Sequence, residues 1–92
     1  MDMALIFKAL SDQSRLAIVS LVAKNKEICA CELLKELAIT QTTLSHHMKV
    51  LVQAKIIQET KRGRWKHYTL ASDTINDCLS FFNHLLKQGG NK

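Results

Sequence analysis

The chain has 92 residues, a length that fits one domain and excludes a catalytic domain beside a separate regulatory one. Hydrophobic residues make up 47% and charged residues 23%, with no proline and three glycines. This composition excludes collagen-like and disordered proteins. We therefore expect a single folded domain spanning residues 1–92.

The formal net charge of +5 is concentrated in one segment, residues 49–68. The residues on either side of this segment carry equal numbers of basic and acidic side chains. Within it, Glu59 is the one acid, and the basic residues are Lys49, Lys55, Lys61, Arg62, Arg64 and Lys66. Local positive charge is typical of proteins that bind a polyanion, although a solvated lysine face is the alternative interpretation.

The sequence has no apolar run of eighteen residues, so we expect no helix that crosses a membrane. The N-terminal segment has Asp2 where a signal peptide needs basic residues, and Lys8 interrupts its apolar stretch. We therefore expect a cytoplasmic protein. Three cysteines form a poor disulfide framework, and a cytoplasm would keep them reduced.

Hydrophobic periodicity predicts five helices. In chain order they cover about 2–10, 12–24, 29–38 and 41–54, and the last begins after Ser72 or Asp73. Before this last helix, two β-rich runs at 56–61 and 65–70 are joined at Gly63, which predicts a β-hairpin. Ile28, between the second and third helices, has the character of a short strand.

Two helices joined by a short turn and followed by a basic hairpin form a winged helix-turn-helix. We therefore expect a mainly α fold with five helices and a two-stranded wing. The last helix should bury a stripe of Ile75, Leu79, Phe82 and Leu86, which Phe81 and Leu85 widen. So much apolar surface on a terminal helix of a short chain favours dimerisation.

The helix predicted at 41–54 has one apolar and one polar face. Its candidate DNA-contacting residues are Gln41, Thr42, Thr43, Ser45, His46 and Lys49. Gln can pair with adenine, Thr can contact a base through its hydroxyl or methyl group, and Lys49 can reach a phosphate. His47 lies nearer the apolar face, and we expect it to be a partly buried, hydrogen-bonded packing residue.

The predicted hairpin carries the densest positive charge. Its candidate DNA-contacting residues are Lys61, Arg62, Arg64 and Lys66. The two arginines flank Gly63, an arrangement that suits entry into a narrow minor groove or contact with its phosphates. We expect Trp65 and Tyr68 to anchor the hairpin to the helices. A winged helix that binds another protein is a rival hypothesis, and an enzyme is disfavoured because the chain leaves little room for a substrate pocket.

Three segments resemble the ArsR/SmtB family of metal- and stress-responsive winged-helix repressors. They are FKALSDQSRLAIVSLV, ICACELLKELAITQTTLSHHMKVLVQAKII and ETKRGRWKHYTL. The resemblance implies a homodimer joined through the first and last helices. It also implies that the dimer binds an inverted-repeat operator on double-stranded DNA without any cofactor and is released by an inducer. By matching position, it assigns base reading to Gln41, Thr42, Thr43, Ser45 and His46.

Within that family, ICACELL looks like the ELCVCDL element whose cysteine pair binds a thiophilic ion. Cys29 and Cys31 are the matching residues. Side chains at i and i+2 of a regular helix point about 200° apart, so a pair that shares an ion must straddle a helix boundary. Cys29 and Glu32 have the spacing of a capping box, which predicts Cys29 at the cap and Cys31 in the first turn. The helix N-terminus, with Lys35 nearby, would favour thiolates.

The inducer expected from this resemblance is trivalent arsenic or antimony, or a soft divalent metal ion. A third cysteine found in some arsenic sensors would fall at Leu34, so Cys78 is the candidate third ligand. Packing at the dimer interface is the favoured interpretation of Cys78, with a metal ligand or a redox partner as the alternatives. The alternatives for the pair are a redox or persulfide switch and two small core residues. A zinc sensor is disfavoured because Ile75 and Lys87 occupy ligand positions of the zinc-type site.

Overall fold

Aspartate side chains cap the N-termini of the first two helices. In the computed structural model, which describes residues 2–89, Asp2 accepts the backbone N–H of Leu5 and caps α1 (Met3–Leu10). Asp12 accepts the N–H of Arg15 in the same way and caps α2 (Gln13–Asn25). These caps place both helix starts within a residue or two of the predicted positions.

The central helix pair has the predicted helix-turn-helix arrangement. The turn at residues 37–40 joins α3 (Ala30–Glu36) to α4 (Gln41–Gln53), and the side chain of Thr40 accepts the N–H of Thr43. The apolar face of α4 is buried through Leu44, Met48 and Leu51, as its periodicity predicts. The opposite face of α4 is consequently left to solvent.

The sheet has three antiparallel strands in the order β1, β3, β2. They are β1 (Glu27–Cys29), β2 (Ile57–Arg62) and β3 (Trp65–Leu70). The turn between β2 and β3 contains Gly63 with φ of +62°, a conformation that glycine adopts without strain. The predicted two-stranded wing is confirmed as β2 and β3, and β1 adds a third strand where Ile28 was expected to have strand character. Ile28 lies in this strand, opposite Tyr68.

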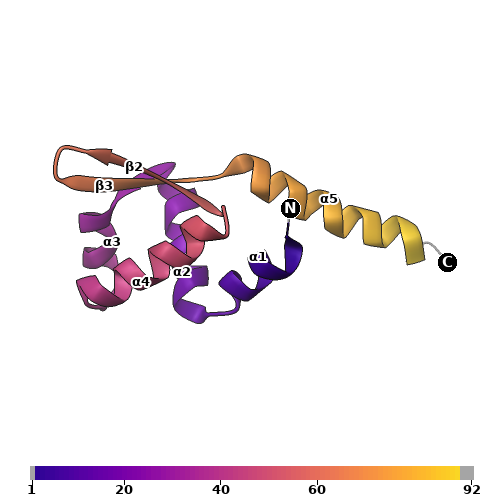
Figure 1. The fold of residues 1–92 in the computed structure, drawn as a ribbon, viewed down its shortest axis with the longest axis horizontal. Helices are drawn as coiled ribbons and strands as arrows, with labels where there is room; N and C mark the ends of the chain where they lie inside the picture. The colour runs from indigo at the N-terminus through magenta and orange to yellow at the C-terminus, as the bar shows by residue number, and fades with distance from the viewer. Residues whose placement is uncertain (1, 90–92) are drawn as a thin grey trace.

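The core lies where the first four helices meet the sheet (Figure 1). Its largest fully buried side chains are Ile6, Ile18, Val22, Leu33, Met48, Leu51, Ile56 and Ile57. Helices, the loop after α4 and strand β2 all contribute to it, so packing fixes the orientation of α4 relative to the wing. These burials are the main favourable term that holds the site in place.

The last helix, α5 (Ser72–Gly89), extends away from this core as an arm, and the molecule measures 52 × 23 × 21 Å (Figure 1). Ile75 is half-buried, but Leu79, Phe82 and Leu86 are 50–65% exposed. The prediction that this stripe is buried is therefore wrong for one chain alone, because the helix extends beyond the surface that could cover it. Within residues 2–89, no helix combines the length and apolarity needed to cross a bilayer.

Candidate DNA-binding surface and cysteine pair

All the DNA-contacting residues that the sequence predicts on α4 are exposed in the structure. Exposed side chains on α4 are Gln41, Thr42, Thr43, Ser45, His46 and Lys49. Thr43 differs from the others because its hydroxyl accepts a hydrogen bond from the hydroxyl of Thr40 at 2.9 Å. Thr43 is thus partly engaged in capping its own helix, while the other side chains point into solvent.

The two adjacent histidines of α4 have different environments. His46 is exposed, whereas His47 is 8% exposed and its Nδ1 lies 3.2 Å from a guanidinium nitrogen of Arg15. Arg15 also donates from Nε to the carbonyl oxygen of Ala9 at 2.6 Å. The prediction that His47 is a hydrogen-bonded packing residue is confirmed, and its partner Arg15 was not anticipated.

Two of the four basic wing residues are ion-paired. Arg62 donates to Glu27 at 2.7 Å, and Lys66 lies 3.7 Å from Glu59. Lys61 and Arg64 are exposed and make no ion pair with other residues in the range 2–89. The proximity of Glu59 to Lys66 follows from the hairpin register, which could have been derived once Gly63 was placed at the turn. No local signal marks Glu27, which is 35 positions from Arg62.

The two large aromatic residues of β3 lie on opposite faces of the sheet. Tyr68 is buried, and burial together with the negative charge of Glu59 raises its pKa to about 12. Trp65 is 44% exposed. The anchoring role is confirmed for Tyr68, whereas Trp65 is only partly covered and lines a pocket beside α3 and α4.

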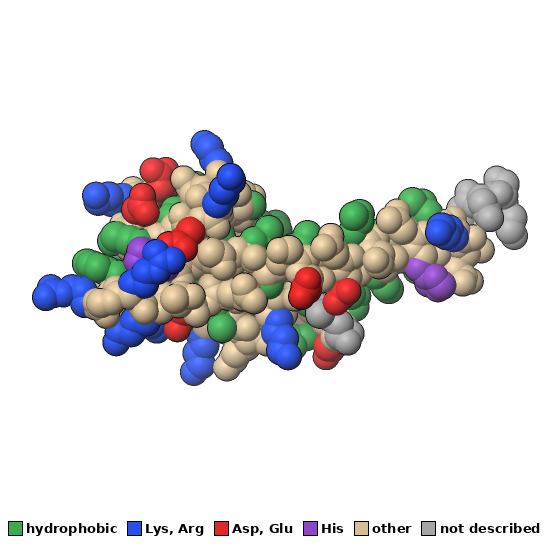
Figure 2. Space-filling model, turned by 90° about the horizontal axis from the view of Figure 1, so that it is seen from above, with side chains coloured by type: hydrophobic (Ala, Val, Ile, Leu, Met, Phe, Trp, Pro, Cys, Tyr) green, Lys and Arg blue, Asp and Glu red, His purple; other side chains and the backbone are tan. Residues whose placement is uncertain are grey.

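The wing and the start of α4 flank one concave surface. A pocket of about 200 Å³ opens between them, and its polar lining comes from Gln41 and Ser45 on the helix side and from Arg64 and Lys66 on the wing side. Its other lining residues are Ala30, Leu34, Leu44, Trp65 and Tyr68. Figure 2 shows Lys and Arg side chains gathered toward this end of the molecule, while hydrophobic side chains mark the α5 arm. The arrangement can therefore present polar, hydrogen-bonding groups and positive charge to one ligand.

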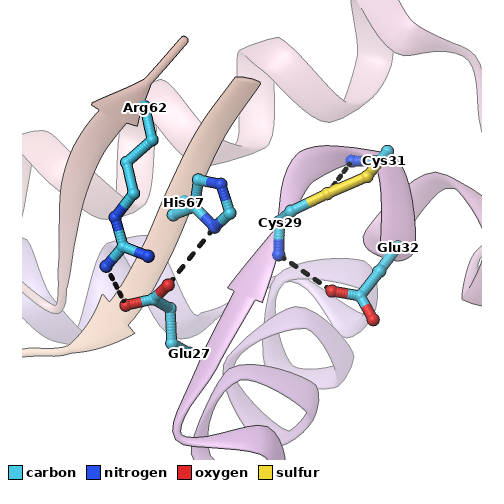
Figure 3. Close-up of polar contacts among 6 residues, drawn as sticks. All are labelled: Glu27, Cys29, Cys31, Glu32, Arg62 and His67. Atoms are coloured by element: carbon cyan, nitrogen blue, oxygen red, sulfur yellow. Dashed lines mark hydrogen bonds and ion pairs between the residues drawn. A yellow bond between two sulfur atoms is a disulfide. The ribbon is translucent and has the colours of Figure 1, made fainter. Parts of the chain in front are cut away.

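The cysteine pair straddles the boundary between β1 and α3, as predicted (Figure 3). Cys29 is the N-cap of α3, and its Sγ accepts the backbone N–H of Cys31 at 3.1 Å. The carboxylate of Glu32 accepts the N–H of Cys29 at 3.3 Å, which completes the predicted capping box. The local geometry inferred from the spacing is therefore confirmed.

A disulfide joins Cys29 to Cys31 (Figure 3), so the expectation that both are free thiols is contradicted. The two cysteines can be joined because they lie on either side of the boundary between β1 and α3, where their Cα atoms are 5.3 Å apart. A disulfide offers no thiolate, so this form does not bind a thiophilic ion. Once reduced, the two thiolates could bind such an ion together, because Cys29 and Cys31 are only two residues apart at the boundary between β1 and α3.

Cys78 is a free, half-buried cysteine on α5 that packs against the core. Helices α3 and α5 lie at opposite ends of the molecule (Figure 1). Across residues 2–89, no three His, Cys, Asp or Glu side chains form a group that could hold a metal ion. One chain therefore does not bring Cys78 to the pair as a third ligand.

Comparison with known proteins agrees with this architecture. The family described as "Bacterial regulatory protein, arsR family" matches residues 12–59, which span α2, β1, α3, α4 and the first part of β2. The arsenical resistance operon repressor of Staphylococcus xylosus is 41% identical over 85 residues, 89% of this chain and 81% of the relative. Both matches include the cysteine pair and α4.

Two solved structures share the fold. An ArsR family transcriptional regulator has a TM-score of 0.86 at 18% identity and covers 98% of this chain and 92% of its own. The homodimeric winged helix-turn-helix DNA-binding domain of a Mycobacterium bovis protein has a TM-score of 0.73 at 20% identity and covers 94% and 79%. The five-helix winged fold, the match over residues 12–59 and the similarity across most of the chain show that this protein belongs to the arsR family of bacterial transcriptional regulators and is not an enzyme.

Proposed function

We propose that the chain is a homodimeric repressor that binds an inverted-repeat operator and is released by a thiophilic inducer at Cys29 and Cys31. The single observation that carries the proposal is the exposed polar face of α4 beside the basic wing. In the proposed complex, α4 enters the major groove and the wing contacts the flanking backbone or minor groove. No cofactor is required for DNA binding.

The chemistry of the α4 face supports base reading. We assign it to Gln41, Thr42, Thr43, Ser45 and His46, with Lys49 on phosphate. Apolar residues are absent from this set, and its members are exposed in the free protein, so binding displaces water instead of breaking packing. On the wing, Lys61, Arg62, Arg64 and Lys66 would contact phosphates and give affinity without sequence preference.

Dimerisation is supported by the apolar surface that one chain leaves uncovered. Leu79, Leu85 and Leu86 of α5 are about half exposed or more. Phe7 of α1 packs its ring 5.7 Å from that of Phe82, so α1 and α5 present a common apolar surface. A second copy bound to this surface would supply a second α4, so that the two helices could enter successive major grooves. The Mycobacterium bovis neighbour is described as homodimeric.

Sensing at the cysteine pair is supported by the position of the two sulfurs and by the name of the Staphylococcus xylosus relative. Reduced Cys29 and Cys31 would bind trivalent arsenic or antimony, or a soft divalent metal ion. Binding would reshape the start of α3, which leads into α4 through the short turn. A coupling of ~1–3 kcal/mol per site is enough to release DNA.

The experiment is an in vitro selection of operator sequences with the reduced protein, followed by release with arsenite. An inverted repeat should emerge, and Gln41→Ala and Thr42→Ala should alter base preference, whereas Lys49→Ala should weaken binding to all sequences. The Cys29→Ser/Cys31→Ser variant should bind DNA and resist arsenite, with Cys78→Ser as the matched control that still responds. Arsenite release of the double variant would place sensing elsewhere.

A thiol redox repressor of the same fold is the second candidate, favoured by the disulfide between Cys29 and Cys31. Under this alternative, oxidation of the pair releases the operator and arsenite does not. Titration of the operator complex with diamide and, separately, with arsenite distinguishes the two. Release by diamide alone would favour the redox function, and release by arsenite under reducing conditions would favour the first proposal.

A further inference from the structure

The carboxylate of Glu27 is shared between two residues of the wing (Figure 3). Its Oε1 accepts a hydrogen bond from the Arg62 guanidinium at 2.7 Å, and its Oε2 lies 3.3 Å from Nδ1 of His67. Glu27 belongs to β1, whereas Arg62 and His67 belong to β2 and β3. One side chain on the edge strand therefore contacts both strands of the wing.

Strand register places these groups and Cys29, the first cysteine of the pair, on one face of the sheet. Cys29 is opposite His67 in the β1–β3 pairing, and Glu27 is two residues before Cys29. Residues two apart on a strand share a face, as do directly opposed residues, so Glu27, Cys29 and His67 lie together. Cys29 ends β1 and also caps α3, and a single residue separates it from Glu27 along the strand.

We propose that Glu27 couples the state of the cysteine pair to the DNA affinity of the wing. When Cys29 and Cys31 are bridged, as in this structure, β1 holds Glu27 where its carboxylate binds Arg62 and withdraws that guanidinium from phosphate. When the pair is reduced, β1 relaxes, the contact weakens and Arg62 contacts the operator backbone. This coupling rests on the proposed function, because it requires a wing that binds DNA.

Charge and position both support this direction. A carboxylate and a phosphate compete for the same guanidinium donors, and the negative charge of Glu27 also repels DNA. Arg64, at the tip of the wing, has no ion pair within residues 2–89, so Arg62 is the arginine whose availability Glu27 can change. The side chains of Arg62 and Glu27 are 58% and 35% exposed, so the expected effect on affinity is small, about two- to five-fold.

The first test needs no DNA. Trp65 is the single tryptophan of the chain and is paired with Arg62 across the hairpin, so its fluorescence reports on the wing. The pair is reduced with dithiothreitol or joined as a disulfide with diamide, a diazene that takes up the two electrons and two protons of the thiols. Wild-type fluorescence should differ between the two forms, and Glu27→Gln should remove most of the difference.

Two control variants make this readout specific. Glu59→Gln removes an equal charge from the other acid of the wing and should keep the difference in Trp65 fluorescence. Cys29→Ser/Cys31→Ser keeps Cys78 but cannot form the bridge, so diamide should leave its fluorescence unchanged. An equal response of wild type and Glu27→Gln to bridging would overturn the coupling, whether or not the protein binds DNA.

The second test measures operator affinity in both forms. Glu27→Gln should tighten binding of the bridged form about two- to five-fold beyond the effect of Glu59→Gln, with a smaller gain in the reduced form. In the double-mutant cycle with Arg62→Gln, the gain specific to Glu27→Gln should disappear. Equal gains from both Glu→Gln variants, or weaker binding by Glu27→Gln, would overturn the coupling. Failure of every form to bind DNA would instead contradict the proposed function.

Discussion

Arg15 at the start of α2 donates a hydrogen bond to the buried His47 of α4 while it also binds the carbonyl oxygen of Ala9 at the end of α1. Arginine has donors only, so Nδ1 of His47 is the acceptor in this contact. Three helices thus meet at one guanidinium. Since His47 is next to His46 on the proposed recognition helix, this contact fixes the helix from its buried side.

Replacement of Arg15 by glutamine should lower the free energy of unfolding by about 1–3 kcal/mol, because a charged, largely buried group loses its hydrogen bonds. Urea unfolding followed by circular dichroism measures the change. Arg64→Gln, which alters an exposed arginine of the wing, is the matched control and should leave stability nearly unchanged. An unchanged unfolding midpoint for Arg15→Gln would show that the contact contributes nothing to stability.

Asp12 should make the stability of the fold sensitive to acid. The backbone N–H of Arg15 lowers the pKa of this N-cap carboxyl below its ordinary value of 3.8. A lowered pKa in the folded state means that the stabilisation is complete above about pH 4 and disappears as the pH falls through the folded-state value. Asp12→Asn keeps a capping side chain but removes the titration. Urea unfolding at neutral pH and near pH 3 should show a smaller loss for this variant than for wild type, and equal losses would refute the assignment.

The phenol of Tyr68 should lose its proton only at a pH well above that of a free tyrosine. Its pKa is raised to about 12, so folded protein should keep the phenol protonated well above pH 10, the ordinary value. The associated stability is complete below about pH 10 and declines as the pH rises toward 12. Tyr68 is the single tyrosine, so phenolate absorbance reports it directly. Glu59→Gln should lower the pKa part of the way, and titration at the ordinary value in folded protein would contradict the buried position.

The apolar face of α5 should control oligomeric state. Leu79→Glu places a charge on the exposed stripe and should shift the protein toward monomer, because the dimer would have to bury that charge. Ser80→Glu adds the same charge at the neighbouring exposed position on the helix and should remain dimeric. Sedimentation velocity at several concentrations measures both variants. Dimerisation of Leu79→Glu at wild-type concentrations would place the interface elsewhere.

The features that the sequence predicts correctly depend on short-range spacing. The buried face of α4 follows from the period of Leu44, Met48 and Leu51, and the polar face follows from the same period. The position of Cys29 at a helix cap follows from Glu32 three residues later. Such patterns are set within one or two turns of helix, so they are visible without tertiary information.

The features that the sequence does not reveal depend on contacts between distant segments. Glu27 contacts Arg62 because β1 pairs with β3 at the edge of the wing, and although Ile28 suggested a short strand, the sequence does not show which strand it pairs with. Arg15 contacts His47, 32 positions away in the sequence, because α2 packs against α4 in the folded chain. The partial exposure of Trp65 likewise depends on how the wing packs against α3 and α4, which the sequence does not show.

The salt dependence of operator binding by the reduced protein measures how far the α4 face and the basic wing contact DNA phosphates. Fluorescence anisotropy with the selected inverted repeat should give a log–log plot of affinity against salt with a steep negative slope, and Arg64→Gln should reduce that slope by about one. A scrambled duplex should bind more weakly with a similar slope. Affinity that is independent of salt, or no binding to any duplex in dilute buffer, would contradict the proposal that α4 and the wing form a DNA-binding surface.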